Sequence, residues 1–121
     1  MLNGSDSSKF KGGRQVLQID AGLNDFEALA EESDRAIMLF PTLPEFYMYN
    51  GIAHVKLKNY DRAIESLNMG KALVFDNPGM SGQFYSSLGD AYHALEEHDK
   101  SDERYTKALD YDPNNVFVLN K

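Results

Sequence analysis

The chain is an acidic sequence of 121 residues with a net charge of −7, and its length suits one domain. Because it has no cluster of Lys and Arg that could replace phosphate counterions, we expect no nucleic-acid partner. The absence of cysteine excludes disulfides and thiolate chemistry, and no apolar run approaches the roughly 18 residues of a membrane span.

The first segment, residues 1–9, is polar and rich in Gly and Ser, so we expect a flexible N-terminal linker or a cloning remnant. No apolar core of a secretory signal follows Met1. We therefore expect a soluble protein, which is either cytoplasmic or exported to the periplasm after removal of a leader.

Residues 10–43 contain one clear helix and one weak helix. In the second half of this segment apolar residues recur at helical spacing, and Asn24 or Asp25 is placed to cap the helix. In the first half, glycines interrupt a stretch that offers few apolar residues. There we expect one short helix, or irregular structure, at about residues 15–21.

The rest of the chain repeats itself at a shift of about 38 residues. The motif Tyr47-x3-Gly51, for example, recurs as Tyr85-x3-Gly89. A fixed period of this length indicates a solenoid of small units, each of which buries its apolar face against its neighbours. Such an organisation favours binding over catalysis.

The spacing resembles the tetratricopeptide repeat (TPR), a helix pair of about 34 residues. The unit that starts at Gly82 matches both helix signatures, at Tyr85, Leu88, Gly89, Tyr92, Ser101, Tyr105, Ala108 and Pro113. The unit that starts at Pro44 departs more from the pattern. Asn50 stands where Leu is typical, and Gly70 stands where Ala is typical.

The resemblance implies an all-α fold, a right-handed α-solenoid of antiparallel helix pairs with about five or six helices. It divides the chain into a degenerate first repeat (10–43), a second repeat (44–81), a third repeat (82–115) and the start of a further helix (116–121). The second repeat has about one extra helical turn. We place that turn at the end of its second helix, through residues 71–75, and a longer loop at residues 76–79 is the alternative.

Residues 116–121 are mostly apolar and include Phe117 and Leu119. Arrays of repeats need polar capping elements at their ends. We therefore expect either a fragment of a larger bacterial TPR protein or a chain that self-associates through this segment.

Small residues mark the points where helices are expected to cross. Two helices approach to about 8–10 Å only where the contacting side chains are short. We therefore expect Gly51 to face Ala63 and Gly89 to face Ser101. The resemblance gives Ala108 and Pro113 structural positions in the second helix and the turn after it.

Two histidine-containing patterns are candidates for chemistry. Residues 96–99 form an acidic cluster around His98, where a general base near a carboxylate is conceivable. We prefer a solvated turn with Asp99 as a helix N-cap and Asp61 in the corresponding place. His54 and His93 occupy neighbouring repeats but lack the further ligands that a metal needs. We therefore expect no enzyme, no catalytic residue, no metal and no cofactor.

In TPR proteins the first helices of successive repeats line a concave surface that meets the ligand. The corresponding residues here are Glu45, Met48, Tyr49, Ile52, Val55, Lys56, Gln83, Ser86, Ser87, Asp90, His93 and Ala94. TPR domains that clamp a peptide carboxylate use Lys and Asn at positions where this chain has Met48, Ile52, Ser86 and Asp90. A terminal carboxylate is therefore not the expected ligand.

These observations predict a non-catalytic protein–protein interaction module that binds a peptide or helix segment in a concave groove. A neutral or basic partner is easier to accommodate than an acidic one, because the chain is acidic. The alternative is a structural spacer or self-association segment of a larger multidomain protein.

Overall fold

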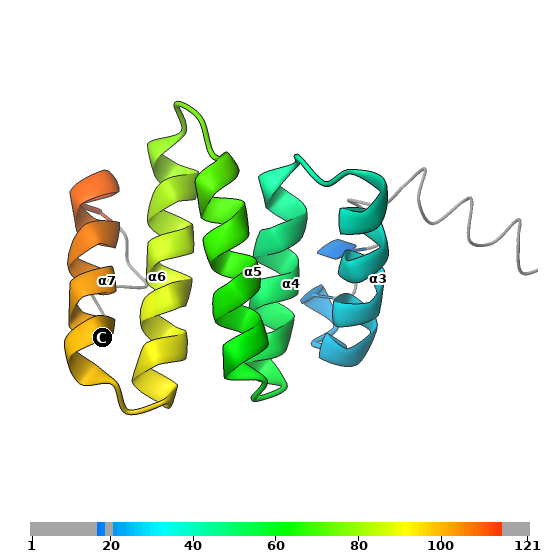
Figure 1. Ribbon diagram of the computed structural model, residues 1–121, viewed down its shortest axis with the longest axis horizontal. Coiled ribbons are helices and arrows are strands. Elements are labelled where there is room, and N and C mark those ends of the chain that lie inside the picture. Colours follow the sequence, from blue (N-terminus) through cyan, green and yellow to red (C-terminus); the bar gives the residue numbers. More distant parts are fainter. Residues whose placement is uncertain (1–16, 19–20, 115–121) are drawn as a thin grey trace, which may run out of the picture.

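The computed structural model describes residues 17–18 and 21–114, and within them it contains five long helices and no strand. The helices are α3 (Phe26–Leu39), α4 (Pro44–Lys56), α5 (Tyr60–Leu73), α6 (Pro78–Ala94) and α7 (His98–Tyr111). Figure 1 shows them one after another across the molecule, each antiparallel to the next and packed against it. The predicted all-α solenoid of antiparallel helix pairs is confirmed.

The start of the described chain is also helical, at residues 17–18 and 21–22. The remainder of the short helix expected at 15–21 lies outside the described residues, as do the linker at 1–9 and the segment at 116–121. The boundaries of the three repeats stay predictions.

The extra helical turn lies at the start of α6, and both predicted placements are wrong. Helices α3, α5 and α7 each have 14 residues, whereas α6 has 17 and α4 has 13. The reason is a strong helix start after α5. Pro78 occupies the first turn of α6, and the side chain of Asn77 accepts a hydrogen bond from the Met80 amide at 3.0 Å.

The expected helix caps are correct for α3 and wrong for α5 and α7. Asp25 caps α3 by accepting a hydrogen bond from the Ala28 amide at 3.2 Å. The N-cap residues of α5 and α7 are Asn59 and Glu97, and neither makes a side-chain cap bond. Both helices begin two residues earlier than expected, which places Asp61 and Asp99 in the first turn. Their charges still favour that end of the helix dipole.

The core consists of two apolar clusters, and α4 contributes to both. The cluster between α4 and the preceding helical segments contains Leu17, Leu29, Ala30, Ala36, Phe46 and Ala53. The cluster that joins α4, α5 and α6 contains Tyr47, Met48, Leu67, Phe84 and Leu88. Helix α4 is therefore covered on both sides and joins the two clusters.

Glycine allows the helices to approach closely, although the contact partners differ in part from those expected. A Cβ atom on Gly51 would lie 2.3 Å from a methyl carbon of Leu67, and one on Gly89 would lie 2.5 Å from the Tyr105 ring. The expected contact of Gly89 with Ser101 is present, because the Ser101 hydroxyl donates to the Gly89 carbonyl at 2.9 Å. For Gly51, the three nearest atoms all belong to Leu67 and none to Ala63, because the longer side chain fills the space over the glycine. Ala63 and Ala108 are buried, and Pro113 is exposed in the turn after α7.

A buried asparagine joins three helices. Asn50 of α4 is fully buried, and its amide nitrogen donates to Ser33 Oγ at 2.9 Å and to Asp34 Oδ1 at 2.8 Å, both on α3. Its amide oxygen accepts a hydrogen bond from Ser66 Oγ of α5 at 2.5 Å. Since a carboxylate only accepts, Asp34 fixes which side of the amide is nitrogen. Asp34 also forms an ion pair with Arg62 of α5 at 3.2 Å.

The close contact at Gly70 generates a stability prediction. A Cβ atom there would lie 2.6 Å from both the Phe84 ring and Tyr47 Cβ. We expect Gly70→Ala to lower the free energy of unfolding by about 1–3 kcal/mol, because the core is already filled. Gly79→Ala is the matched control, since its new methyl group would meet only Asn77 at 3.7 Å. Because alanine favours helix, it should be neutral or stabilising by up to about 1 kcal/mol in urea unfolding. An equal loss in both variants would contradict the packing argument.

The Asn50 network generates a second prediction. We expect Asn50→Leu to lower the free energy of unfolding by about 1–3 kcal/mol, although Leu88 holds the equivalent position of the next repeat, because the buried Ser66 hydroxyl loses its acceptor and Ser33 and Asp34 lose a donor. Adding Ser66→Ala to this variant should recover part of the loss, because it removes the unsatisfied hydroxyl, whereas the Ser33 hydroxyl still donates to the Ala30 carbonyl at 3.1 Å. Chemical denaturation of the single and the combined variant measures both changes in the free energy of unfolding. A neutral Asn50→Leu variant would show that the network adds no stability.

Candidate functional site

A shallow pocket opens between α4 and α6, the first helices of the second and third predicted repeats. It is lined by Ile52, Val55, Lys56, Ser87 and Asp90, and we call it the α4–α6 groove. Its volume is about 70 Å³, far below the several hundred Å³ of a typical small-molecule site. The space suits one side chain of a partner molecule better than a whole small ligand.

Two residues expected to meet a partner are covered instead. Met48 is 9% exposed and Ser86 is 6% exposed. Met48 belongs to the core cluster of α4, α5 and α6, where the Ser87 hydroxyl lies 3.8 Å from its sulfur. The reason is the direct contact of α4 with α6, which leaves no room for a ligand above Met48. The short side chain of Ser86 lies below the surface.

The other residues expected on the concave face are accessible but scattered. Tyr49 is half-buried and packs against the cluster that contains Leu17 and Leu29, so it lies toward α3 and not in the α4–α6 groove. His93 lies against His98 at the start of α7, with 5.4 Å between ring centroids. Glu45 is half-buried, and Gln83 and Ala94 are exposed.

The charged residues of the groove lie on opposite walls, Lys56 on α4 and Asp90 on α6. Asp90 accepts a hydrogen bond from the Tyr105 hydroxyl of α7 at 2.5 Å. Burial, followed by the hydrogen bond to Asp90, raises the pKa of Tyr105 far above its usual value, so the phenol stays protonated. A protonated phenol holds the Asp90 carboxylate in place as a fixed acceptor.

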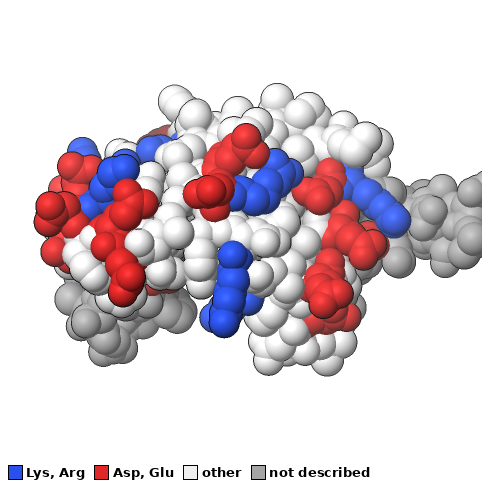
Figure 2. Space-filling view, turned by 60° about the horizontal axis from the view of Figure 1, so that its bottom comes forward, with Lys and Arg blue, Asp and Glu red and all other residues white. Residues whose placement is uncertain are grey.

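The molecular surface shows how unevenly charge is distributed. In Figure 2, carboxylates lie in groups at both ends and near the middle of the face that is displayed, with Lys and Arg side chains among them. Uncharged surface separates these groups. A partner would therefore meet different charges at different repeats, and the local side chains decide its chemistry more than the net charge does.

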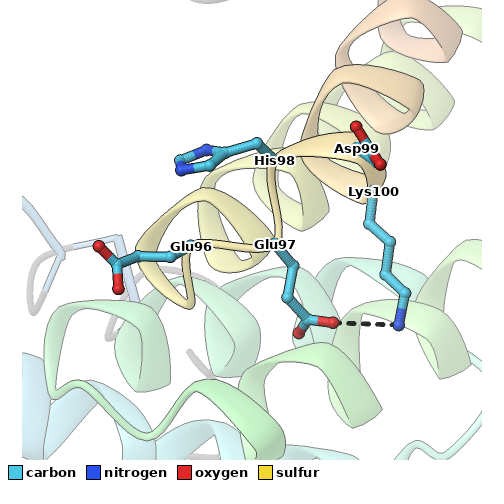
Figure 3. A pocket seen from close by; sticks show the side chains of 5 residues that line it. All are labelled: Glu96, Glu97, His98, Asp99 and Lys100. Atoms are coloured by element: carbon cyan, nitrogen blue, oxygen red, sulfur yellow. Dashed lines mark ion pairs between the residues drawn. The ribbon is translucent and has the colours of Figure 1, made fainter.

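The acidic turn between α6 and α7 is open and its side chains do not converge. Figure 3 shows the side chains of residues 96–100 pointing in different directions, apart from the ion pair of Glu97 with Lys100 at 3.1 Å. A general base needs a partner within hydrogen-bond reach. Among the described residues, His98 has no hydrogen bond or ion pair. The arrangement supports a solvated turn.

Two further searches cover only the described part of the chain. Across residues 17–18 and 21–114, no three His, Cys, Asp or Glu side chains are close enough together to hold a metal ion. In the same ranges, every helix is too short or too polar to cross a membrane.

His54 is half-buried and interacts electrostatically with Asp34, a member of the Asn50 network, and with Arg62. Its Nδ1 lies 3.4 Å from the Asn59 amide nitrogen, and its buried Nε2 has no hydrogen-bond partner among the described residues. Burial lowers the pKa of His54 below 6.5, Asp34 on α3 opposes this effect, and Arg62 on α5 reinforces it. The imidazole is therefore neutral at pH 7 and acts as a packing residue.

Comparison with known proteins adds a family and a shared fold. Residues 82–115 match the family model of the tetratricopeptide repeat. The small glutamine-rich tetratricopeptide repeat-containing protein 2 of Saccharomyces cerevisiae is 32% identical over 92 residues. That alignment covers 76% of this chain and 25% of the yeast protein, so the chain spans about a quarter of its curated relative.

Two solved structures of similar fold contain bound peptides. The first TPR of Spaghetti (RPAP3) bound to the HSP90 peptide SRMEEVD superposes with a TM-score of 0.81 at 20% identity, covering 94% of this chain and 87% of that chain. The second TPR domain of human RPAP3 in complex with the HSP70 peptide SGPTIEEVD gives a TM-score of 0.77 at 16% identity, covering 88% and 86%. At these identities the likeness shows the fold alone.

The environment of His54 generates a prediction of pH dependence. Because its pKa is lower in the folded chain than its ordinary value of 6.5, the unfolded chain binds the proton more readily. The free energy of unfolding should therefore fall as the pH drops below 6.5 and level off below the folded pKa. His54→Gln should flatten this part of the curve in urea titrations. His93→Gln, a change at an exposed histidine, should leave it unaltered, and the opposite pattern would contradict the assignment.

Proposed function

Because this chain belongs to the tetratricopeptide repeat family, we propose that it is a non-catalytic protein-interaction module whose α4–α6 groove binds a peptide or helix segment of a partner. The observation that carries this proposal is the pocket between the first helices of two successive repeats. Ile52 and Val55 give it an apolar wall, and Lys56 and Asp90 give it one charge of each sign.

The groove chemistry favours a neutral or basic segment. The peptides bound to the two RPAP3 domains, SRMEEVD and SGPTIEEVD, both end in acidic residues. This chain places Ile52 and Asp90 where a carboxylate clamp needs basic or amide side chains. An acidic peptide end would therefore meet an apolar wall and a like charge. An apolar side chain in the pocket and a basic group near Asp90 fit better.

Several expectations stay predictions. They include the bacterial origin, the compartment, and the alternative role as a spacer or self-association segment. The residues proposed for self-association, Phe117 and Leu119, lie outside the described residues. Sedimentation at several protein concentrations tests the self-association hypothesis. Dimers that the Phe117→Asp substitution abolishes would support that hypothesis.

The groove proposal predicts which substitutions weaken binding. A panel of labelled peptides with neutral, basic and acidic sequences, including SRMEEVD, should yield binders among the neutral and basic members. Ile52→Asp should lower their affinity about tenfold, about 1.4 kcal/mol, because it places a carboxylate in the apolar wall. Asp90→Asn should weaken only the basic members, since it removes the charge and can still accept a hydrogen bond from Tyr105. Fluorescence anisotropy measures the affinity of each variant for each peptide.

Matched controls separate the groove from general charge effects. Met38→Asp introduces the same carboxylate at an exposed apolar residue of α3, and Asp61→Asn removes an exposed charge from α5. Neither should change affinity. Preferential binding of SRMEEVD would overturn the charge preference, and equal losses in controls and groove variants would overturn the site.

A further inference from the structure

A group of basic side chains lies over one side of α6. Around the axis of α6, this side is about half a turn away from Ser87, which lines the α4–α6 groove. Lys100, Arg104 and Lys107 share one face of α7, because they are spaced by four and three residues. On α6, Tyr85 and Tyr92 lie seven residues apart on one face, whereas Ser87 is displaced from Tyr85 by about 200°. Three basic side chains of this acidic chain therefore gather on one face of α7, with Glu103 beside them.

The tyrosine rings of α6 hold Lys71, Lys100 and Arg104 in place. Lys71 Nζ of α5 lies 4.9 Å from the centroid of the Tyr85 ring. Lys100 Nζ and the Arg104 guanidinium carbon lie 5.5 Å and 5.4 Å from the centroid of the Tyr92 ring. A cation over an aromatic face is attracted to it and is restricted in its motion. We call Lys71, Lys100, Arg104, Lys107 and the two rings the α5–α7 basic surface.

The cations of this surface are only partly neutralised. Arg104 pairs with Glu103 and Lys100 pairs with Glu97, both within α7 or its cap. Within the described part of the chain, Lys71 and Lys107 form no ion pair, and the buried Nε of Arg104 has no hydrogen-bond partner. Burial, followed by the like charges of Arg104 and Lys107, lowers the pKa of Lys71. An anionic ligand would relieve this repulsion.

We propose that the α5–α7 basic surface binds an acidic segment of a partner protein, whose side-chain carboxylates pair with Lys71, Arg104 and Lys107. The tyrosine rings hold Lys71 and Arg104 in position before binding, which reduces the entropy that a partner must overcome. This surface is separate from the α4–α6 groove and takes the opposite charge.

The size of the surface selects a short acidic peptide over a nucleic acid. From Lys100 to Lys107 the helix rises about 10 Å, which matches about three residues of an extended chain. Asp99, Asp102, Glu103 and Asp110 lie on the same helix and would repel a long polyanion. A few carboxylates fit between these acidic residues, whereas a continuous phosphate backbone does not.

The test uses the full chain and a short fluorescein-labelled peptide of alternating Glu and Leu with an amidated end. We expect binding that weakens as salt rises from about 0.05 M to about 0.3 M. The analogue in which Gln replaces Glu should not bind. Lys107→Glu should weaken binding about five- to tenfold, and Lys71→Met, which keeps the length of the side chain, should weaken it several-fold. Circular dichroism checks that the variants stay folded.

Lys58→Glu is the matched control, since it reverses an exposed lysine in the turn between α4 and α5. It should change affinity less than about twofold. Equal losses for Lys58→Glu and Lys107→Glu would overturn the proposal, because attraction would then follow the net charge alone. Binding of a single-stranded oligonucleotide in place of the peptide would also overturn it. Ile52→Asp should leave the affinity for this peptide unchanged. Failure of the basic-surface proposal can therefore be distinguished from failure of the groove proposal.

Discussion

The close approach of paired helices at two glycines determines the geometry on which both surfaces depend. Leu67 fills the space over Gly51, and Tyr105 at the equivalent position fills the space over Gly89. Each contact brings the second helix of a pair against the first, because no side chain intervenes. In the third repeat this packing also brings the Tyr105 hydroxyl to Asp90, so the same residue that closes the helix pair orients the groove carboxylate.

The two helix pairs are specified by different interactions. In the pair of α6 and α7, the position equivalent to Asn50 holds the apolar Leu88. Burial, which has no preferred direction, is enough to stabilise the packing there. In the earlier pair, Asn50 bonds to α3 and α5 with defined geometry. A buried amide tolerates few alternative registers, because each alternative leaves polar groups unpaired. The departure from the repeat pattern at Asn50 therefore strengthens the specification of the fold in this repeat.

Much of the fold could be predicted from the sequence, because glycine spacing and helix periodicity are local signals. The placement of the extra turn could not be predicted, because it depends on competition between continuing α5 and starting α6 at Pro78, and residues 76–79 were expected at most as a loop. For the groove, the sequence predicted which helix faces would line it but not which residues of those faces would be accessible. Which residues stay accessible depends on how closely α4 and α6 pack, and that distance covers Met48 while leaving Ile52 open.

The complete basic surface gave no sequence signal, because the helical spacing of Lys100, Arg104 and Lys107 places only these three on one face, and Lys71 comes from a helix that is separated along the chain. Lys71 lies far in sequence from Arg104, and they become neighbours only when α5 and α7 flank α6. The net charge of the chain does not reveal such a cluster, because it sums the charges of faces that a single partner does not contact together. The α4–α6 groove and the α5–α7 basic surface lie on different sides of α6, and the partners that we propose for them carry opposite charges. One straight segment cannot occupy both, so the solenoid is suited to hold two partners, or two separate segments of one partner, on either side of the same helix.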